Sequence, residues 1–496
     1  MERLASELAE NLEAFRALFH APENCDFVVR ELAPHGVRMA ALYIDGMANR
    51  RNLEDMVLRP LMNMRPFGGM APEGRSAALA AQVLPTGTGK LESGVRKIAD
   101  FVLDGNCAVL CDGCAQAVLA EMPGFASRAV DQPPIESAAF APHEAFNETI
   151  RTNLTLLHRI LRTPDFVTEI LEIGDSSKTK VAVTYLSGVA NPAVVREVKR
   201  RLEGVEVDRL LSIGQLQQLI EDRPFGLLPQ IMQTERPDRV ASFLTDGMVA
   251  IACDGAPYML AAPATFWHFL HTPDDHALRW QYGTFMRLVR VLGFFLSLLL
   301  PAVYNSLLLY HQELLPTDML TSILEGYTLV PLSVTLELLL MDFVFDLINE
   351  ASLRMPGNMG STLGIVGGLV LGQAAVSANL ISPLLIIVVS VGALCGAELS
   401  PVPCGAHRQA RAGAGLDARG ICRDGRGAAV HPVRGRSHGQ LRHAVLRAGH
   451  AAHAAQPGPV PAPARLLADP APGHGAPRRG RRGAESAEVG SGRAGP

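Results

Sequence analysis

The chain has 496 residues, of which 48% are hydrophobic, 19% charged and 5% aromatic, so it is neither a disordered protein nor an average soluble one. At ~150 residues per domain this length allows about three domains, and the net charge of −4 argues against a nucleic-acid-binding protein, which is normally basic. The charge is unevenly divided, because residues 401–496 carry a net charge of +10 and the first 400 residues −14.

The N-terminal residues 1–29 are expected to contain one amphipathic helix. Charged residues are spread through the first turns, so the segment lacks the apolar run of a signal peptide. We therefore expect the part of the chain that follows it to stay in the cytoplasm.

An internal repeat follows at a constant offset of 142 residues. Residues 97–113 match residues 239–255 with 8 of 17 positions identical, and residues 43–49 match residues 185–191 with 4 of 7 identical. Each copy predicts a strand, turn and helix, and then a helix, an Asp-Gly turn of the hairpin type and a strand. The repeat predicts tandem duplicated α/β subdomains over residues 30–135 and 145–280, with a loop inserted in the first copy over residues 61–90.

Motifs for a bound cofactor or metal are incomplete. The stretch PTGTGK at residues 85–90 departs from a phosphate-binding loop at two positions, Leu84 and Leu91. Cys111 and Cys114 form a C-x2-C pair, but a zinc site needs a second pair and the other copy keeps only Cys253. We expect no cofactor, no metal, no disulfide in an intracellular chain and no enzymatic activity.

Two polar clusters in the second copy are candidates for a functional role. One is LPQIMQTERPDRV at residues 228–240, with Glu235, Arg236 and Asp238 around a proline; the other is EAFNETIRTN at residues 144–153. The clusters either couple the soluble part to a membrane part or form an internal network of ion pairs and helix caps.

Residues 285–397 are predicted to form a helical membrane domain with several spans. Residues 291–312 contain no Asp, Glu, Lys or Arg, and about 20 apolar residues cross a bilayer. Residues 355–397 are also uncharged and are long enough for two spans with a break near residues 379–383. Arg279, Arg287 and Arg290 precede the first span, which places this flank in the cytoplasm.

Three carboxylates interrupt the apolar segment over residues 329–348. Glu337, Asp342 and Asp346 are costly at mid-bilayer, so they face either protein or a water-filled path, or they lie at helix ends among the headgroups. The sequence leaves pore-lining and interfacial roles open.

The last segment, residues 398–496, is expected to be disordered. From residue 401 onward 64 of 96 residues are Ala, Gly, Arg or Pro, and no Phe, Tyr, Trp or Lys occurs. GC-rich codons read out of frame give this composition, so we expect that residues from about Cys395 onward are not native sequence. A basic tail that binds membrane or nucleic acid is the alternative.

The order of several motifs resembles one protein family. EAFNETIRTN, YLSGVAN, PQIMQTERPDRV, PATFWHF, LPAVYNSLLLYHQELLP and GIVGGLVLGQAAV occur in this order between about residues 30 and 397. They look like the A subunit of the spore germinant receptor, the GerA family, to which the stage V sporulation protein AF type is related. TERPD is the most specific short motif.

The resemblance implies a multi-pass protein of the spore inner membrane with a cytoplasmic N-terminal domain. It implies a role in nutrient-triggered spore germination and ion release, with a transporter-like B subunit, a lipoprotein C subunit and further copies of the chain as partners, in a lipid bilayer and without nucleic acid. Members continue with another apolar span and a motif like SFGTPFFAP, which this chain encodes only in a shifted frame. A secondary transporter or ion channel unrelated to germination is the alternative.

Overall fold

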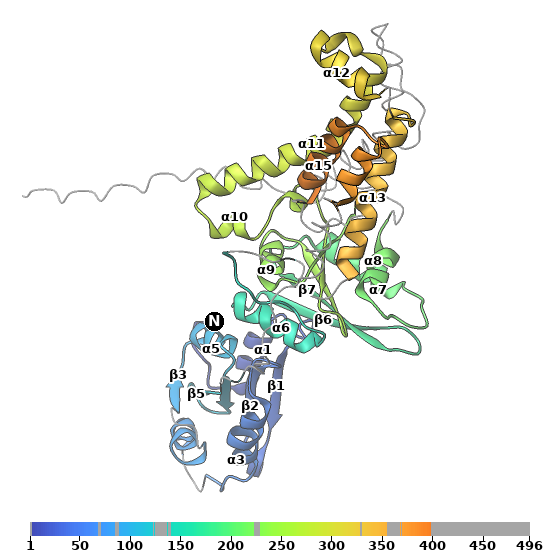
Figure 1. The fold of residues 1–496 in the computed structure, drawn as a ribbon. Helices are drawn as coiled ribbons and strands as arrows, with labels where there is room; N and C mark the ends of the chain where they lie inside the picture. Colours follow the sequence, from blue (N-terminus) through green and yellow to red (C-terminus); the bar gives the residue numbers. More distant parts are fainter. Residues whose placement is uncertain are drawn as a thin grey trace, which may run out of the picture. The chain divides into compact units, whose positions relative to one another are not determined.

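The computed structural model describes residues 2–67, 71–84, 89–122, 124, 136, 140–222, 229–327, 330–354, 368 and 370–397. The expected disordered tail over residues 398–496 and the centre of the PTGTGK stretch lie outside the described residues. The described chain begins with two α/β regions and continues into a helical region (Figure 1).

The first α/β region is built on an antiparallel five-stranded sheet in the order β1-β2-β4-β5-β3. Its central strands are apolar and buried along nearly their whole length, as suits a sheet covered on both faces. The strands are β1 (Phe27–Leu32), β2 (Met39–Ile44), β3 (Lys90–Glu92), β4 (Cys107–Cys111) and β5 (Ala117–Ala120).

Helices cover both faces of this sheet. α1 (Leu8–Leu18) and α5 (Val95–Leu103) pack on one face, where Phe15 and Ile98 are fully buried. The other face carries α2 (Arg50–Leu53), η2 (Glu54–Leu58), α3 (Arg59–Met62), α4 (Arg75–Ala78) and η4 (Leu79–Val83). The prediction of a loop over residues 61–90 is thus wrong in part, since leucines such as Leu79 are buried against the sheet and hold short helices there.

The second α/β region repeats this architecture, with a sheet in the order β6-β7-β9-β10-β8. α6 (Ile150–Ile160) and α9 (Pro237–Thr245) cover one face. α7 (Pro192–Glu203) and α8 (Ile213–Ile220) cover the other. The strands are β6 (Phe166–Ile173), β7 (Thr179–Leu186), β8 (Met232–Thr234), β9 (Val249–Cys253) and β10 (Met259–Ala262).

The bounds of corresponding elements differ by the sequence offset of 142 residues. This holds at both ends of the pairs β3/β8, α5/α9, β4/β9, β5/β10 and α1/α6. The last pair extends the correspondence to the N-terminal helix, which the sequence comparison treated as a separate segment.

One polar contact pattern fixes the start of α1 and of α6. The Asn11 side chain accepts from the amide of Ala5 and donates to its carbonyl oxygen, both at 2.8 Å. Asn153 does the same to Asn147, at 2.8 and 2.6 Å. Because both asparagines are buried, these bonds pair their amide groups with half-buried backbone groups of Ala5 and Asn147.

The Asp-Gly pairs at residues 104–105 and 246–247 are not hairpin turns. Gly105 and Gly247 have φ of +86° and terminate α5 and α9 before the next strand. An added Cβ at Gly105 would lie 2.9 Å from the Met47 carbonyl oxygen, so glycine is needed there for space as well as conformation. The expectation of a turn was right and its type was wrong.

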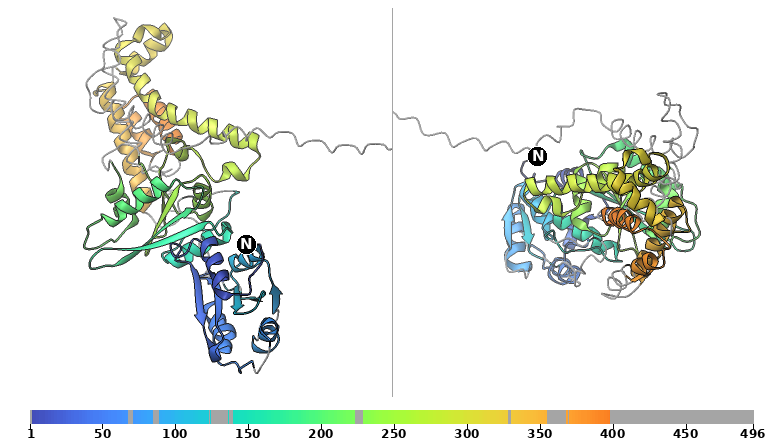
Figure 2. Two further views of the ribbon diagram at one scale, coloured as in Figure 1. Left: turned by 180° about the vertical axis from the view of Figure 1, so that it is seen from behind. Right: turned by 45° about the horizontal axis from the view of Figure 1, so that its top comes forward.

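The helical region starts with η5 (Phe266–Leu270) and α10 (Asp274–Ala277) and continues into α11 (Trp280–Tyr310). Among the described residues α11 alone is long and apolar enough to cross a membrane, and α15 (Pro383–Ala397) is a shorter apolar helix. η6 (Gln312–Leu314), α12 (Thr317–Tyr327) and α13 (Val334–Arg354) lie between them. α11, α13 and α15 pack around a shared apolar core (Figures 1 and 2).

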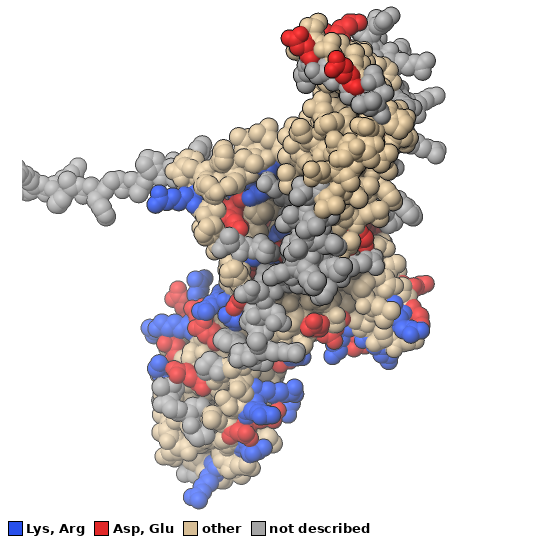
Figure 3. Space-filling model, viewed as in Figure 1, with Lys and Arg blue, Asp and Glu red and all other residues tan. Residues whose placement is uncertain are grey.

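Charged side chains mark the two ends of this region. Figure 3 shows the helices mostly free of charge on this face, with acidic groups at α12. α12 carries Asp318 and Glu325, whereas Arg279, Arg287 and Arg290 lie at the start of α11. The expected break in the last uncharged segment is present, since the chain leaves a helical stretch near Asn379 and begins α15 at Pro383.

Replacing Asn11 or Asn153 by alanine tests the duplicated contact. Each change leaves a half-buried amide and carbonyl without their side-chain partner, so we expect each to cost about 1–3 kcal/mol of stability. Circular dichroism of the detergent-solubilised full chain should show a lower unfolding midpoint for both variants. Asn191→Ala, which removes one bond to the Ala193 amide on a half-buried helix cap, is the control and should have the smaller effect. Unchanged midpoints for both buried asparagines would contradict the assignment.

Candidate functional site

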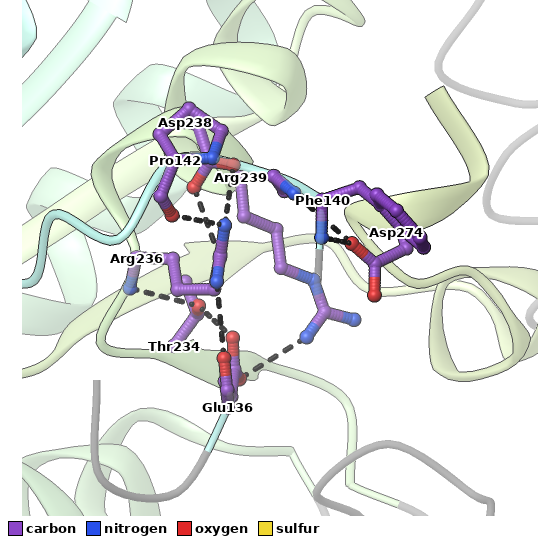
Figure 4. Close-up of polar contacts among 9 residues, drawn as sticks. Glu136, Phe140, Pro142, Thr234, Arg236, Asp238, Arg239 and Asp274 are labelled. Carbon is purple, nitrogen blue, oxygen red and sulfur yellow. Dashed lines mark hydrogen bonds and ion pairs between the residues drawn. The ribbon is translucent and has the colours of Figure 1, made fainter. Parts of the chain in front are cut away.

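The candidate site centres on Arg236, the residue that precedes α9. Its side chain is fully buried. The guanidinium donates to Asp238 Oδ1 at 3.1 Å and Oδ2 at 2.9 Å, to the Glu136 carbonyl oxygen at 3.0 Å and to the Pro142 carbonyl oxygen at 2.8 Å (Figure 4). Asp238 lies in the first turn of α9, where a carboxylate is favourable, and Pro237 starts the helix at a position that needs no amide.

Glu136 brings the linker between the two α/β regions into this cluster. Its amide donates to Glu235 Oε1 at 2.7 Å, and its Oε2 accepts from the Thr234 hydroxyl at 2.7 Å. The Thr234 oxygen in turn accepts from the Arg236 amide at 3.2 Å. The TERP segment therefore holds the linker through both side chains and backbone.

Arg239, one turn into α9, links the same linker to the segment before α11. It donates to Glu136 Oε1 at 3.1 Å and to the carbonyl oxygens of His268 and His271 at 3.1 and 3.2 Å. Its guanidinium also lies 5.5 Å from the centre of the Phe243 ring. Burial lowers the pKa of Arg239 and raises the pKa of Glu136, while their mutual attraction opposes both shifts. The pair therefore depends on its hydrogen bonds to compensate for lost hydration.

Asp274 and Asp275 extend the contacts to α11. Asp274 Oδ1 accepts from the amides of Phe140 and Ala141 at 3.0 and 3.1 Å, so α10 also holds the linker. Asp275 accepts from Arg290 at 2.7 and 2.8 Å and from Arg287 at 3.2 Å, both on α11.

The Asp275 carboxylate is kept ionised by these arginines. Its burial would raise the pKa, but hydrogen bonds from Arg290, the Thr272 amide and Arg287 outweigh burial and lower it. The stability from this contact is therefore present above the ordinary carboxyl pKa and is lost as pH falls through the lowered value.

An added Cβ at Gly283 would lie 2.7 Å from the Asp275 carbonyl oxygen, so α10 and α11 approach closely here.

A cavity of about 350 Å³ adjoins the cluster. Its walls come from the linker, α9 and the segment before α11, and include Asp238, Arg239, Phe243, Asp246, His268 and His271. Burial lowers the pKa of His268, whose Nδ1 accepts from the Thr265 amide at 3.0 Å. Within the described part of the chain no three His, Cys, Asp or Glu side chains are placed to hold a metal ion.

The structure brings together Glu235, Arg236 and Asp238, and places the three predicted membrane carboxylates elsewhere. Glu337, on α13, is fully buried, and its Oε2 accepts from the Ser382 amide at the start of α15 at 3.2 Å. Its Oε1 has no hydrogen-bond partner among the described residues. Asp342 and Asp346 are half-buried further along α13. They form a second group, separate from the arginine cluster.

Four residues of the cluster were missed by the sequence reasoning: Glu136, Arg239, Asp274 and Asp275. Arg239 directly follows the TERPD motif, so extending the motif by one residue would have included it. Glu136 and the two aspartates are about 100 and 40 residues from the motif along the chain, and only folding brings them together. The arrangement as a whole is a polar joint between the linker, α9 and α11.

Comparison with known proteins identifies the class. A family model described as the Bacillus/Clostridium GerA spore germination protein matches residues 13–397. The chain belongs to this GerA family.

Individual relatives agree with this assignment. The chain is 32% identical over 394 residues to spore germination protein KA of Bacillus subtilis (strain 168), which covers 79% of this chain and 72% of that protein. It is 36% identical over 392 residues to spore germination protein B1 of the same organism, which covers 79% and 80%. The crystal structure of the N-terminal domain of the A subunit of the Bacillus megaterium spore germinant receptor GerK3 is 29% identical, covers 53% of this chain and 97% of that domain, and aligns with a TM-score of 0.43.

Arg236→Ala tests the centre of the joint. The change leaves Asp238 and the carbonyl groups of Glu136 and Pro142 without their fully buried donor, so we expect a loss of about 3–5 kcal/mol in stability. Arg236→Lys keeps the charge but loses the planar guanidinium group with its several donors. Its stability should lie between that of the parent and that of the alanine variant. Thermal unfolding of the full chain in detergent, followed by circular dichroism, measures both.

Arg200→Ala is the matched control, because it removes an exposed arginine that pairs with Glu197 on α7. It should leave the unfolding midpoint close to that of the parent. Equal effects of the Arg236 and Arg200 changes would contradict a central role for Arg236.

Proposed function

We propose that this chain is a membrane subunit of a spore germinant receptor and acts in nutrient-triggered germination. Membership of the GerA family supports the role in germination. A cytoplasmic position for the tandem α/β regions, a multi-pass membrane domain in the spore inner membrane and a non-catalytic mode of action are parts of the same proposal. The arginines at the start of α11 and the acidic residues at α12 support this orientation.

The proposed partners are a transporter-like B subunit, a lipoprotein C subunit and further copies of this chain. Membership of the GerA family supports a multi-subunit receptor. Apolar side chains exposed along α11, including Leu288, Leu292, Phe295 and Leu299, give lipid or neighbouring helices a surface to cover.

The arginine cluster is proposed to couple the α/β regions to α11. One observation carries this proposal. The linker contacts Arg239 on α9 and Asp274 on α10, and the next residue, Asp275, contacts Arg290 on α11. Apart from the exposed bond between the Phe140 amide and Asp274, these contacts are half-buried, so a shift of the linker or α9 is expected to move the start of α11 or break the contacts.

Asp275→Asn tests this coupling in spores. The amide removes the charge that holds Arg287 and Arg290, so we expect germination in the nutrient mixture that triggers the parent strain to slow by about tenfold. The loss of optical density reports germination, and immunoblots of spore membranes report the amount of protein.

Asp222→Asn is the matched control, because Asp222 also pairs with an arginine, Arg201, but is exposed and far from α11 along the chain. Spores with this change should germinate at the parental rate. Parental germination of the Asp275 variant at normal protein level would refute the coupling.

We further propose that Asp342 and Asp346 face a hydrated path for ions, whereas Glu337 mainly fixes α13 against α15. The two aspartates are four residues apart and share a face of α13, while Glu337 accepts a hydrogen bond from the Ser382 amide, just before α15. The alternative, an interfacial place for the aspartates, predicts no effect on ions.

Asp342→Asn separates these two alternatives. If the aspartate lines a path, potassium release from germinating spores, measured with an ion-selective electrode, should change while the receptor still assembles in the membrane. Glu313→Gln, an exposed carboxylate outside α13, is the control and should leave release unchanged. Normal release from the Asp342 variant would favour the interfacial alternative.

A further inference from the structure

The turn between β4 and β5 carries two thiols that the proposed germination role does not use. Cys111 ends β4 and Cys114 follows three residues later; both are free and buried. The Cys114 amide donates to the Cys111 carbonyl oxygen at 3.2 Å, and Gly113 has φ of +83°. The cysteines are therefore the first and fourth residues of a closed β-turn.

This geometry suits a disulfide. The first and fourth Cα atoms of a β-turn lie less than about 7 Å apart, and a disulfide joins Cα atoms roughly 4.4–6.8 Å apart. The two thiols lie close enough together for each to shift the pKa of the other. A bond between the sulfurs can therefore form with little movement of the backbone.

The surroundings favour a thiolate on Cys114. The hydrogen bond from Cys111, donors on Ser76 and the charge of Arg75 lower the pKa of Cys114 to about 6, against the opposing effect of burial. The Cys114 thiol, when protonated, donates to the Pro72 carbonyl oxygen at 2.9 Å. The interaction with Cys114 and burial raise the pKa of Cys111, which keeps its proton.

Arg75 is placed to act on this turn. Its guanidinium donates to the Asp112 carbonyl oxygen at 3.4 Å, and its buried Nε has no hydrogen-bond partner among the described residues. A positive charge held at the turn stabilises negative charge on sulfur.

The second copy contains the same turn, but it carries one cysteine where the first copy carries two. Cys253 and Ala256 correspond to Cys111 and Cys114, the Ala256 amide donates to the Cys253 carbonyl oxygen at 3.3 Å, and Gly255 has φ of +83°. Burial raises the pKa of Cys253 to about 11. Turn geometry alone therefore requires neither a second thiol nor a lowered pKa.

We propose that Cys111 and Cys114 form a vicinal dithiol site that undergoes thiol–disulfide exchange with low-molecular-weight disulfides such as oxidised glutathione. The Cys114 thiolate attacks one sulfur of the small disulfide, forming a mixed disulfide and releasing one thiolate. The Cys111 thiol then loses its proton and attacks the Cys114 sulfur, which closes the protein disulfide and releases a second thiol. The protein loses two hydrogens, and the small disulfide is reduced to two thiols.

The redox state of this site would act on α1. The turn residues Asp112 and Gly113 hold the start of α1, because the Asp112 side chain accepts from the Leu8 amide at 3.1 Å and the Gly113 amide donates to the Ser6 carbonyl oxygen at 2.9 Å. The thiols are covered by residues 72–76, so a small disulfide reaches them when this segment opens locally.

Peptide mapping of the native full chain in detergent tests the site. The protein is incubated with oxidised and reduced glutathione, quenched with acid, alkylated and digested with trypsin, which places residues 98–128 and 240–279 on separate peptides. We expect the first peptide to lose two hydrogens without retaining glutathione, and Cys114→Ala to abolish this loss. The Cys253 peptide is the internal reference and should stay reduced.

A second measurement follows alkylation of the reduced protein against pH. Cys114 should react at least ~10-fold faster than Cys253 at neutral pH, and its rate should rise through a midpoint near the lowered pKa. The proposal fails if the disulfide forms only after denaturation, if a glutathione adduct persists on Cys114 without ring closure, or if Cys114 and Cys253 react at equal rates.

Discussion

The burial of the Arg236 guanidinium constrains everything around it. A charged group without access to water must have every donor near an acceptor, so Asp238 and the carbonyl oxygens of Glu136 and Pro142 have fixed places relative to α9. Arg239 imposes the same condition on the opposite side, toward His268 and His271. The described linker residues Glu136 and Pro142 are thereby held against α9. The long apolar helix α11 begins shortly after these contacts.

Much of the α/β architecture could be predicted from one numerical regularity, the offset of 142 residues. Apolar strands and Asp-Gly turns recur at that spacing because both copies pack helices on a sheet with the same strand order. The correspondence of α1 and α6 was harder to detect, since of their aligned residues only Asn11 and Asn153 and the leucines that follow them are identical. Those asparagines are the polar residues that the fold requires, which is why they persist among exchangeable apolar neighbours.

The candidate site was predictable only as far as it is local in sequence. The TERPD motif singled out Glu235, Arg236 and Asp238 because charges around a proline stand out in a mostly apolar chain. Glu136, Asp274 and Asp275 carry no such signal, since single acidic residues in loops are common and their partners are set by tertiary structure. The sequence analysis placed the three carboxylates predicted to lie in the membrane in one group. In the structure Glu337 is fully buried, whereas Asp342 and Asp346 are half-buried. Spacing along a helix shows which residues share a face, but it does not show what that face meets.

The contacts between α9 and the linker affect where the chain can be cut to express a folded fragment. A fragment that starts at the edge of the second repeat, near residue 145, would contain all of its strands and helices. It would nevertheless lack Glu136, Phe140 and Pro142, and so leave Arg236 and Arg239 facing empty positions in the middle of an otherwise complete fold. An expression boundary placed before residue 136 keeps those partners, even though it adds residues that belong to neither repeat. Soluble yield of such fragments would thus be decided by a few residues of linker more than by the choice of strands.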